Sequence, residues 1–181
     1  MPQINVVAWM IGIAPAIIAI VALYVDGRRN RIALQTQLLL HLNEQWCSDE
    51  IKMLRRRVAQ NLLRKRSPNY ELGELLDFIS VICYLYQDKA VNVNCIATQF
   101  GWWIIRYWLC AKEWVSNIRA VDPEGWKTFE LVAGKLMLLD ERRGSMPPSD
   151  QELCYFLKVE SQLFAMKARA PQPSLRRAVA A

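Results

Sequence analysis

Hydrophobic residues recur along most of the chain at intervals of three and four, which is the spacing of one face of an α-helix. One clear stripe consists of Ile51, Leu54, Val58 and Leu62. Residues 71–87 carry a second, broader stripe. No segment alternates convincingly between apolar and polar residues at every second position, as a half-buried strand does. The pattern therefore predicts an all-α protein.

Capping residues divide the chain after residue 30 into about five helices. Residues whose side chains commonly accept a hydrogen bond from the first turn of a helix precede four apolar stretches. They are Ser48, Asn92 or Asn94, Asp122, and Ser149 with the capping-box partner Glu152. We expect a helical bundle over residues 31–169. Residues 170–181 have too little apolar mass to fold and are expected to form a flexible tail.

The first thirty residues have a different pattern. Residues 6–25 contain no charge and no carboxamide, and a helix of about twenty residues matches the thickness of a bilayer. Trp9 and Tyr24 lie near its two ends, where interfacial anchors occur. A signal peptide would need basic residues before the apolar run, and a core helix rarely stays apolar on every side. The segment predicts a single transmembrane helix, with residues 1–30 as the anchor and its basic flank.

The charges beside this segment predict its orientation. Three arginines follow the apolar run and no basic residue precedes it; they are Arg28, Arg29 and Arg31. By the positive-inside rule the N-terminus lies outside and the rest of the chain on the cytoplasmic face, as in a single-pass protein of a bacterial inner membrane. Gly12 and Ala16 are spaced as a small-xxx-small pair, which favours helix pairing within the membrane.

A second basic region occurs in the helix after Ser48. Its members are Arg55, Arg56, Arg57, Arg64, Lys65 and Arg66. The first three lie largely off the apolar stripe of that helix, so we expect the region to face anionic lipid or a protein partner. A nucleic acid is the alternative, because clustered arginine also attracts phosphate, although no known nucleic-acid fold surrounds the cluster.

Residues 98–114 collect four of the chain's seven tryptophans. Trp103, Tyr107 and Trp114 share one face at helical spacing, and we expect this face to pack in the core against the helix of residues 71–87. An aromatic cage for a ligand and a second membrane span are alternatives that this pattern favours less.

Arg106 lies in the middle of this aromatic stretch and argues against a second span, because a charge near the centre of a membrane helix is costly. In a core it needs a carboxylate or an aromatic face. The candidate carboxylates are Glu74, Asp77 and Glu130. We expect Arg106 to form a structural ion pair.

The sequence lacks local motifs for catalysis. It has no glycine-rich phosphate loop, no HExxH and no nucleophile elbow, and its one histidine, His41, has no ligand partner at short spacing. The five cysteines are scattered among apolar residues and are expected to be reduced core thiols. We therefore expect no enzyme, no catalytic residue, no metal and no cofactor.

A family resemblance accompanies the aromatic stretch. The sequence from residue 74 to 108 is similar to a pattern in an uncharacterised family of small bacterial membrane-anchored helical proteins. The matching residues are Leu76, Asp77, Phe78, Phe100, Gly101, Ile104, Tyr107 and Trp108. The family often has acidic residues after the matched phenylalanine, where this chain has Ser80 and Val81. The resemblance implies an anchor followed by helices and no catalytic residue.

Taken together, these features predict a non-enzymatic, membrane-anchored helical interaction or scaffold module. Its expected partners are membrane lipid and either a protein partner or a second copy of the chain. Two other functions stay open at this stage. One is a membrane-localised effector, for stress or phage defence, that oligomerises through its span, and the other is a basic helical domain that binds nucleic acid.

Overall fold

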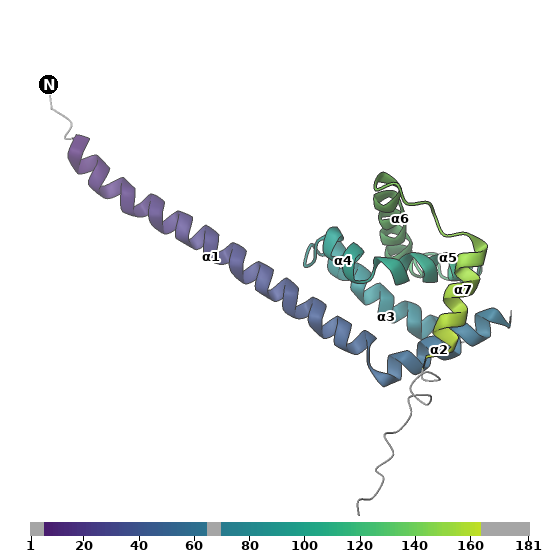
Figure 1. The fold of residues 1–181 in the computed structure, drawn as a ribbon. Coiled ribbons are helices and arrows are strands. Elements are labelled where there is room, and N and C mark those ends of the chain that lie inside the picture. The colour runs from purple at the N-terminus through teal and green to yellow at the C-terminus, as the bar shows by residue number, and fades with distance from the viewer. Residues whose placement is uncertain (1–5, 65–69, 164–181) are drawn as a thin grey trace, which may run out of the picture. The chain divides into compact units, whose positions relative to one another are not determined.

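A computed structural model describes the backbone of residues 6–64 and 70–163, and the side chains of residues 22–64 and 70–163 (Figure 1). Over these residues the chain is entirely helical, which confirms the all-α prediction. The helices are α1 (Val6–Trp46), α2 (Asp49–Leu63), α3 (Tyr70–Gln87), α4 (Val93–Gln99), α5 (Gly101–Ile118), α6 (Lys127–Arg142) and α7 (Asp150–Ser161). The expected tail, residues 170–181, lies outside the described residues.

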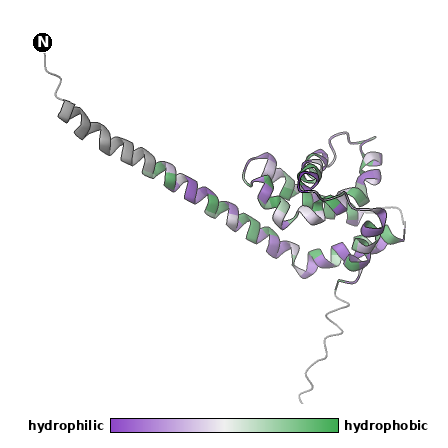
Figure 2. Cartoon of the chain, turned by 45° about the horizontal axis from the view of Figure 1, so that its top comes forward, coloured by the Kyte–Doolittle hydropathy of each residue, from purple (hydrophilic) through white to green (hydrophobic). Residues whose placement is uncertain are grey.

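The chain divides into two compact units, one up to His41 and the other from Leu42 onwards. The sequence predicts a different division, with an anchor and its basic flank up to residue 30 and the bundle from residue 31. The first unit is the greater part of α1, which continues without interruption through Gly27. Residues 22–34 of this helix are exposed, and hydrophilic and hydrophobic residues are intermixed along its described side chains (Figure 2).

No helix is long and apolar enough to cross a membrane within the part of the chain that was described. The expected membrane span is therefore not supported by the structure. Most of that span, including Trp9, Gly12 and Ala16, lies where side chains are not described. Its last residues and its basic flank are described, and Tyr24, Arg28, Arg29 and Arg31 are all exposed.

Local capping explains where most helices of the second unit begin. The Ser48 hydroxyl accepts a hydrogen bond from the Ile51 amide at 3.3 Å, and Asn92 accepts from Asn94 at 2.7 Å. Ser149 and Glu152 form the expected capping box. These interactions satisfy amide groups that have no partner within the helix, and they confirm three of the predicted caps.

Asp122 is not the cap that the sequence indicated. Its carboxylate accepts from the Glu124 amide at 3.3 Å, and its carbonyl accepts from Gly125. These bonds close a tight turn, so α6 begins at Lys127 instead of directly after Asp122. Trp126, the residue before α6, has the left-handed value φ 52°, which is rare for a bulky side chain.

The expected helix through the aromatic stretch is two helices. Phe100 separates α4 from α5, with φ −126° and a buried ring. Its amide still donates to the Ile96 carbonyl at 2.8 Å, while the Trp103 and Ile104 amides donate to the Phe100 carbonyl. Burial of the ring fixes this bend, which helical periodicity does not reveal. The bundle therefore consists of α2 to α7, which agrees with the expectation of about five helices.

Three pairs of helices form most of the core of the second unit. The most extensive contacts are between α2 and α7, between α3 and α6, and between α5 and α6. From α2, the smaller side chains of Leu54, Val58 and Ala59 are buried. Large side chains of α3, α5, α6 and α7, of the end of α1 and of the residue between α4 and α5 are fully buried. They include Trp46, Leu75, Ile79, Phe100, Tyr107, Phe129 and Phe156. This arrangement brings α2, α5 and α7 together around a polar cluster that the apolar pattern did not predict.

Candidate functional site

Arg55 is the clearest departure from the predicted basic surface. Only 5% of the residue is exposed, because α2 turns it towards the interior. Its guanidinium forms two parallel hydrogen bonds with the Glu160 carboxylate on α7, Nη2–Oε1 at 2.6 Å and Nε–Oε2 at 2.7 Å. A side chain held in this way cannot contact lipid, so its assignment to the basic surface is wrong.

Tyr107 of α5 completes this polar cluster. Its hydroxyl donates to Glu160 Oε2 at 2.8 Å. Arg55, Tyr107 and Glu160, which we call the buried cluster, thus join three helices that are far apart in sequence. A bidentate arginine–carboxylate pair with further hydrogen bonds is the geometry in which a buried charge is tolerated.

Aromatic rings surround the guanidinium of the buried cluster. Arg55 Cζ lies 4.3 Å from the centre of the Trp46 ring and 5.6 Å from that of Trp103. Trp46 also packs against Phe78, Phe100 and Tyr107. Cation–π contacts are strongest when water is excluded, so these rings stabilise the charge that the fold has buried.

The ionisation of the buried cluster follows from this packing. Burial acts to lower the pKa of Arg55, but the hydrogen bond and the charge of Glu160 outweigh it, and the pKa is raised. Burial, followed by the charge of Glu160, raises the pKa of Tyr107 well above its usual value. Tyr107 therefore remains a protonated donor at neutral pH, and the cluster is suited to holding helices together.

The other members of the basic region differ in accessibility. Arg56 is half-buried, while Arg57 and Arg64 are exposed. Arg57 Nε lies 3.2 Å from Glu71 Oε1 on α3. Lys65 and Arg66 lie outside the described residues. The structure therefore leaves Arg57 and Arg64 as the clearest accessible cations among the described members of this region.

Arg106 adopts a second arginine–tryptophan arrangement on the other side of α5. Its Cζ lies 4.3 Å from the centre of the Trp102 ring, and Nη1 donates to the Trp102 carbonyl at 3.2 Å. Among the described residues no carboxylate lies within ion-pair distance of it. The expected ion pair is therefore wrong, whereas the need for an aromatic face is met.

Two of the three proposed acidic partners of Arg106 have other contacts, and Glu74 is exposed. Asp77 accepts from Trp126 Nε1 at 2.9 Å, and Glu130 pairs with Arg119. Partial burial lowers the pKa of Arg106, and the charges of Glu152 and Asp140 oppose this shift without contacting the guanidinium. Arg106 thus keeps a positive charge whose hydrogen-bonding capacity is largely unused.

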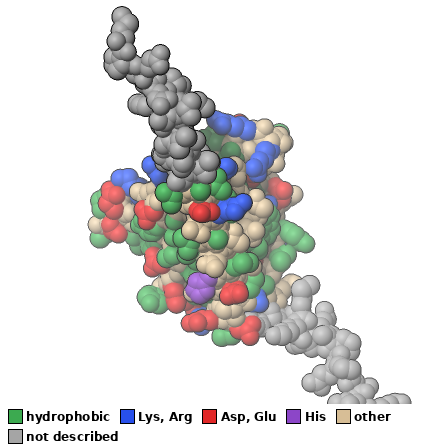
Figure 3. Space-filling view, turned by 90° about the vertical axis from the view of Figure 1, so that its left-hand side faces the viewer, with side chains coloured by type: hydrophobic (Ala, Val, Ile, Leu, Met, Phe, Trp, Pro, Cys, Tyr) green, Lys and Arg blue, Asp and Glu red, His purple; other side chains and the backbone are tan. Residues whose placement is uncertain are grey.

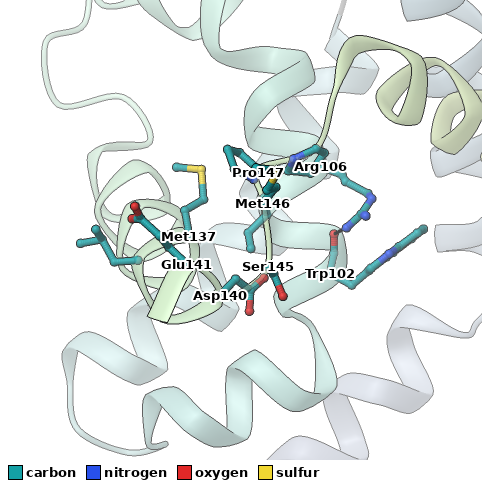
Figure 4. A pocket seen from close by; sticks show the side chains of 12 residues that line it. Trp102, Arg106, Met137, Asp140, Glu141, Ser145, Met146 and Pro147 are labelled. Carbon is teal, nitrogen blue, oxygen red and sulfur yellow. Dashed lines mark hydrogen bonds between the residues drawn. The ribbon is translucent and has the colours of Figure 1, made fainter. Parts of the chain in front are cut away.

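A groove of about 480 Å³ opens beside this second pair, between α5, α6 and the loop that joins α6 to α7. Figure 4 shows Trp102 and Arg106 on one side and Met137, Asp140 and Glu141 on the other, with loop residues between them. The rest of the lining is mostly apolar. Trp102 is 46% exposed and Met146 is 91% exposed, so hydrophobic surface is accessible beside a cation.

The other two aromatic residues assigned to the core have different environments. Trp103 is half-buried and packs edge-to-face on Trp46, with ring centres 5.5 Å apart. Trp114 is half-buried and lies against Gly73 of α3 and beside Trp126. Trp114 is thus the member that faces α3 as expected. Tyr107 instead faces α2 and α7, because Glu160 offers its hydroxyl an acceptor.

The cysteines and the histidine do not form a reactive site. Burial raises the pKa of both Cys83 and Cys110 to about 12, which keeps them protonated. Cys47 and Cys154 are exposed, so the prediction that all five are core thiols is wrong for these two. His41 is exposed as well (Figure 3). Among the described residues no group of side chains is arranged to hold a metal ion.

The groove offers a surface on which a ligand could bind. It combines a mostly apolar lining and one aromatic face with one cation on one wall and the carboxylates of Asp140 and Glu141 on the other. Comparisons of the chain with models of protein families, with curated proteins and with solved structures found no match. The family resemblance noted in the sequence stays a prediction.

Proposed function

We propose that the chain is a non-enzymatic interaction module that binds a short apolar segment of a partner protein in the groove. The observation that carries this proposal is Arg106, stacked on an exposed Trp102 with no carboxylate paired to it. A half-buried cation of this kind favours a partner segment that places a carboxylate beside its apolar residues.

Two features of the groove support a peptide as its ligand. Met137 and Met146 are flexible side chains that can adapt to different apolar residues. Arginine and tryptophan are also the residue types that most often contribute strongly to protein interfaces. The Arg106–Trp102 pair would then fix the register of the bound segment, while the methionines accommodate its apolar side chains.

Selection of peptides from a random displayed library tests this proposal without knowledge of the natural partner. The purified full-length protein is expected to enrich peptides that combine apolar residues with an aspartate or glutamate. The Arg106→Met variant should lose these peptides, whereas Arg142→Met, which changes an exposed arginine at the end of α6, should retain them. Enrichment that survives Arg106→Met would refute the role of the groove.

We further propose that residues 6–25 anchor this module in a bacterial inner membrane, with the N-terminus outside. Only the sequence supports this part: the uncharged run, Trp9 and Tyr24 at its ends, and the arginines that follow it. A reporter enzyme that works only in the cytoplasm should be active when fused after Ala181. Activity of a periplasmic reporter in its place would reverse the proposed topology.

The burial of Arg55 bears on the nucleic-acid alternative. It withdraws one arginine from the cluster on which that alternative rested, and Arg57 already contacts Glu71. Fewer accessible cations mean fewer phosphate contacts and a weaker dependence of binding on salt. The interaction module is therefore the function that we prefer.

A further inference from the structure

A separate acidic pocket of about 390 Å³ lies between α3 and the turn that precedes α6. We use the name acidic pocket for the site lined by Asp77, Ser80, Tyr84, Asp122, Glu124, Gly125 and Trp126. The three residues from α3 are spaced by three and four, so they share one face of the helix. That face is directed into the pocket, opposite the tight turn closed by Asp122.

The carboxylates of the acidic pocket are incompletely neutralised. Glu124 pairs with Lys127 at 2.9 Å, across one turn at the surface. No cation lies within 4.0 Å of Asp77 or Asp122 among the described residues. Arg119, the other nearby cation, donates to the Gly125 carbonyl at 2.8 Å and pairs with Glu130. The pocket therefore retains negative charge.

Ser80 gives a second and independent indication of a ligand. The residue is only 6% exposed, yet its hydroxyl has no hydrogen-bond partner among the described residues. Buried hydroxyl groups are usually paired, and an unpaired one destabilises the fold. Ser80 lines the acidic pocket, and a donor that enters from solvent would supply the missing partner once neighbouring side chains make room for it.

Two aromatic residues form walls beside these charges. Trp126 is fixed by the hydrogen bond from Nε1 to Asp77 Oδ1 at 2.9 Å and by packing on Trp114, with ring centres 5.0 Å apart. Tyr84 is 51% exposed at the other side of the shared α3 face. Aromatic faces beside carboxylates bind organic cations, because the ring quadrupole and the charges both attract them.

We propose that the acidic pocket binds an organic cation, namely an ammonium or guanidinium group with hydrogen-bond donors. Such a group satisfies the Asp77 and Asp122 carboxylates, lies against Trp126 and donates to Ser80. A metal ion fits less well, since no described group of carboxylates, cysteines or histidines is arranged to hold one. The chemistry is that of an arginine or lysine side chain on a partner, or of a free amine.

Fluorine NMR of the full-length protein labelled with 5-fluorotryptophan can test this site directly. The chain has seven tryptophans, and loss of one resonance in Trp126→Phe identifies the signal of Trp126. The probes are N-acetyl-arginine amide, its uncharged analogue N-acetyl-citrulline amide, and 1,4-diaminobutane. A saturable shift of the Trp126 signal with either cationic probe is expected. The probe that binds identifies the preferred group as a guanidinium or an ammonium.

Variants distinguish the acidic pocket from general attraction of cations. Asp122→Asn and Asp77→Asn should each weaken binding of the cationic probe about tenfold, and Ser80→Ala about threefold while leaving the free protein as stable or more stable. Asp88→Asn, which removes an exposed carboxylate after the end of α3, is the matched control and should have no effect. Circular dichroism shows whether each variant is folded, and Asp122→Asn, at an exposed turn, is the least disruptive.

Three results would overturn the proposal. They are the absence of a saturable shift with both cationic probes, equal binding of the citrulline probe, and an equal loss in Asp88→Asn and Asp122→Asn. None of these results depends on the groove, which lies between α5, α6 and the following loop. Failure of the acidic pocket is therefore distinguishable from failure of the proposed function.

Discussion

Two arginines of this protein lie over tryptophan rings at the same distance of 4.3 Å, Arg55 over Trp46 and Arg106 over Trp102. Their surroundings differ in exposure to water and in the presence of a carboxylate partner. Arg55 is buried and bound by Glu160, whereas Arg106 is half-buried with no carboxylate in contact. The same pair of residue types is therefore enclosed in the core in one place and accessible beside a groove in the other.

The largest expected difference between the two pairs comes from removal of the carboxylate. Glu160→Gln leaves Arg55 charged and buried without its partner, so we expect a loss of about 3–5 kcal/mol in the free energy of unfolding. Urea unfolding of the full chain measures this loss. Glu152→Gln, near Arg106 and exposed, keeps a side chain that can complete the capping box and should cost far less stability.

A double replacement sharpens this prediction. Arg55→Met together with Glu160→Leu removes both charges and keeps apolar volume, so it should recover part of the stability that Glu160→Gln loses, although the Tyr107 hydroxyl is left without its acceptor. If the double variant is as unstable as the single one, shape rather than charge pairing holds α7 to α2.

Replacement of Tyr107 is expected to have the next largest effect on stability, and this effect depends on pH. Tyr107→Phe removes a hydrogen bond to a charged group, which is worth about 1.5–3 kcal/mol. Because the pKa of Tyr107 is raised in the folded state, the stability linked to its proton is complete below the unfolded value of about 10 and is lost as pH rises above it. The variant should therefore lose less stability than the wild type above pH 10. Urea unfolding of both proteins across pH 7–11 measures the stability loss and its dependence on pH. An identical pH dependence of stability in the variant and the wild type would contradict the role of the Tyr107 proton.

Double-mutant cycles compare the two arginine–tryptophan contacts themselves. We expect a coupling energy of about 2 kcal/mol for Arg55 and Trp46, where water is excluded, and about 0.5–1 kcal/mol for Arg106 and Trp102. The measured quantity is the free energy of unfolding of each single and double variant. Equal couplings would mean that burial does not distinguish the two pairs, and the comparison would fail.

Local signals in the sequence were sufficient for much of the fold. Ser48 and the Ser149–Glu152 box act within four residues, and the structure shows both caps. The bend at Phe100 and the turn after Asp122 depend on burial of distant side chains, so no periodicity reveals them. Trp126 packs on Trp114 and bonds to Asp77, and neither contact is visible from its neighbours in the chain.

The buried cluster left a signal that could have been used. Arg55 lies four residues after Ile51 and four before Ala59, and Glu160 lies four after Phe156. Two opposite charges at core positions of two helices indicate a buried ion pair. The count of basic residues in α2 concealed this pattern. Arg106 has the same kind of context, but only the structure shows that no carboxylate reaches it.

Replacement of Arg106 is expected to have the smallest effect on stability. It tests most directly whether Arg106 differs in role from Arg55. Arg106→Met keeps the apolar stem over Trp102 and removes a charge that pairs with no carboxylate, so we expect the free energy of unfolding to change by less than 1 kcal/mol. Binding of peptides that the wild type selects should nevertheless fall by more than tenfold. Urea unfolding measures the stability of the variant, and peptide titration of the same preparation measures its binding. Arg55→Met is the comparison variant, which should lose stability. A large loss of stability in Arg106→Met would show that this arginine holds the fold as Arg55 does, and the groove would lose the cation on which its proposed role depends.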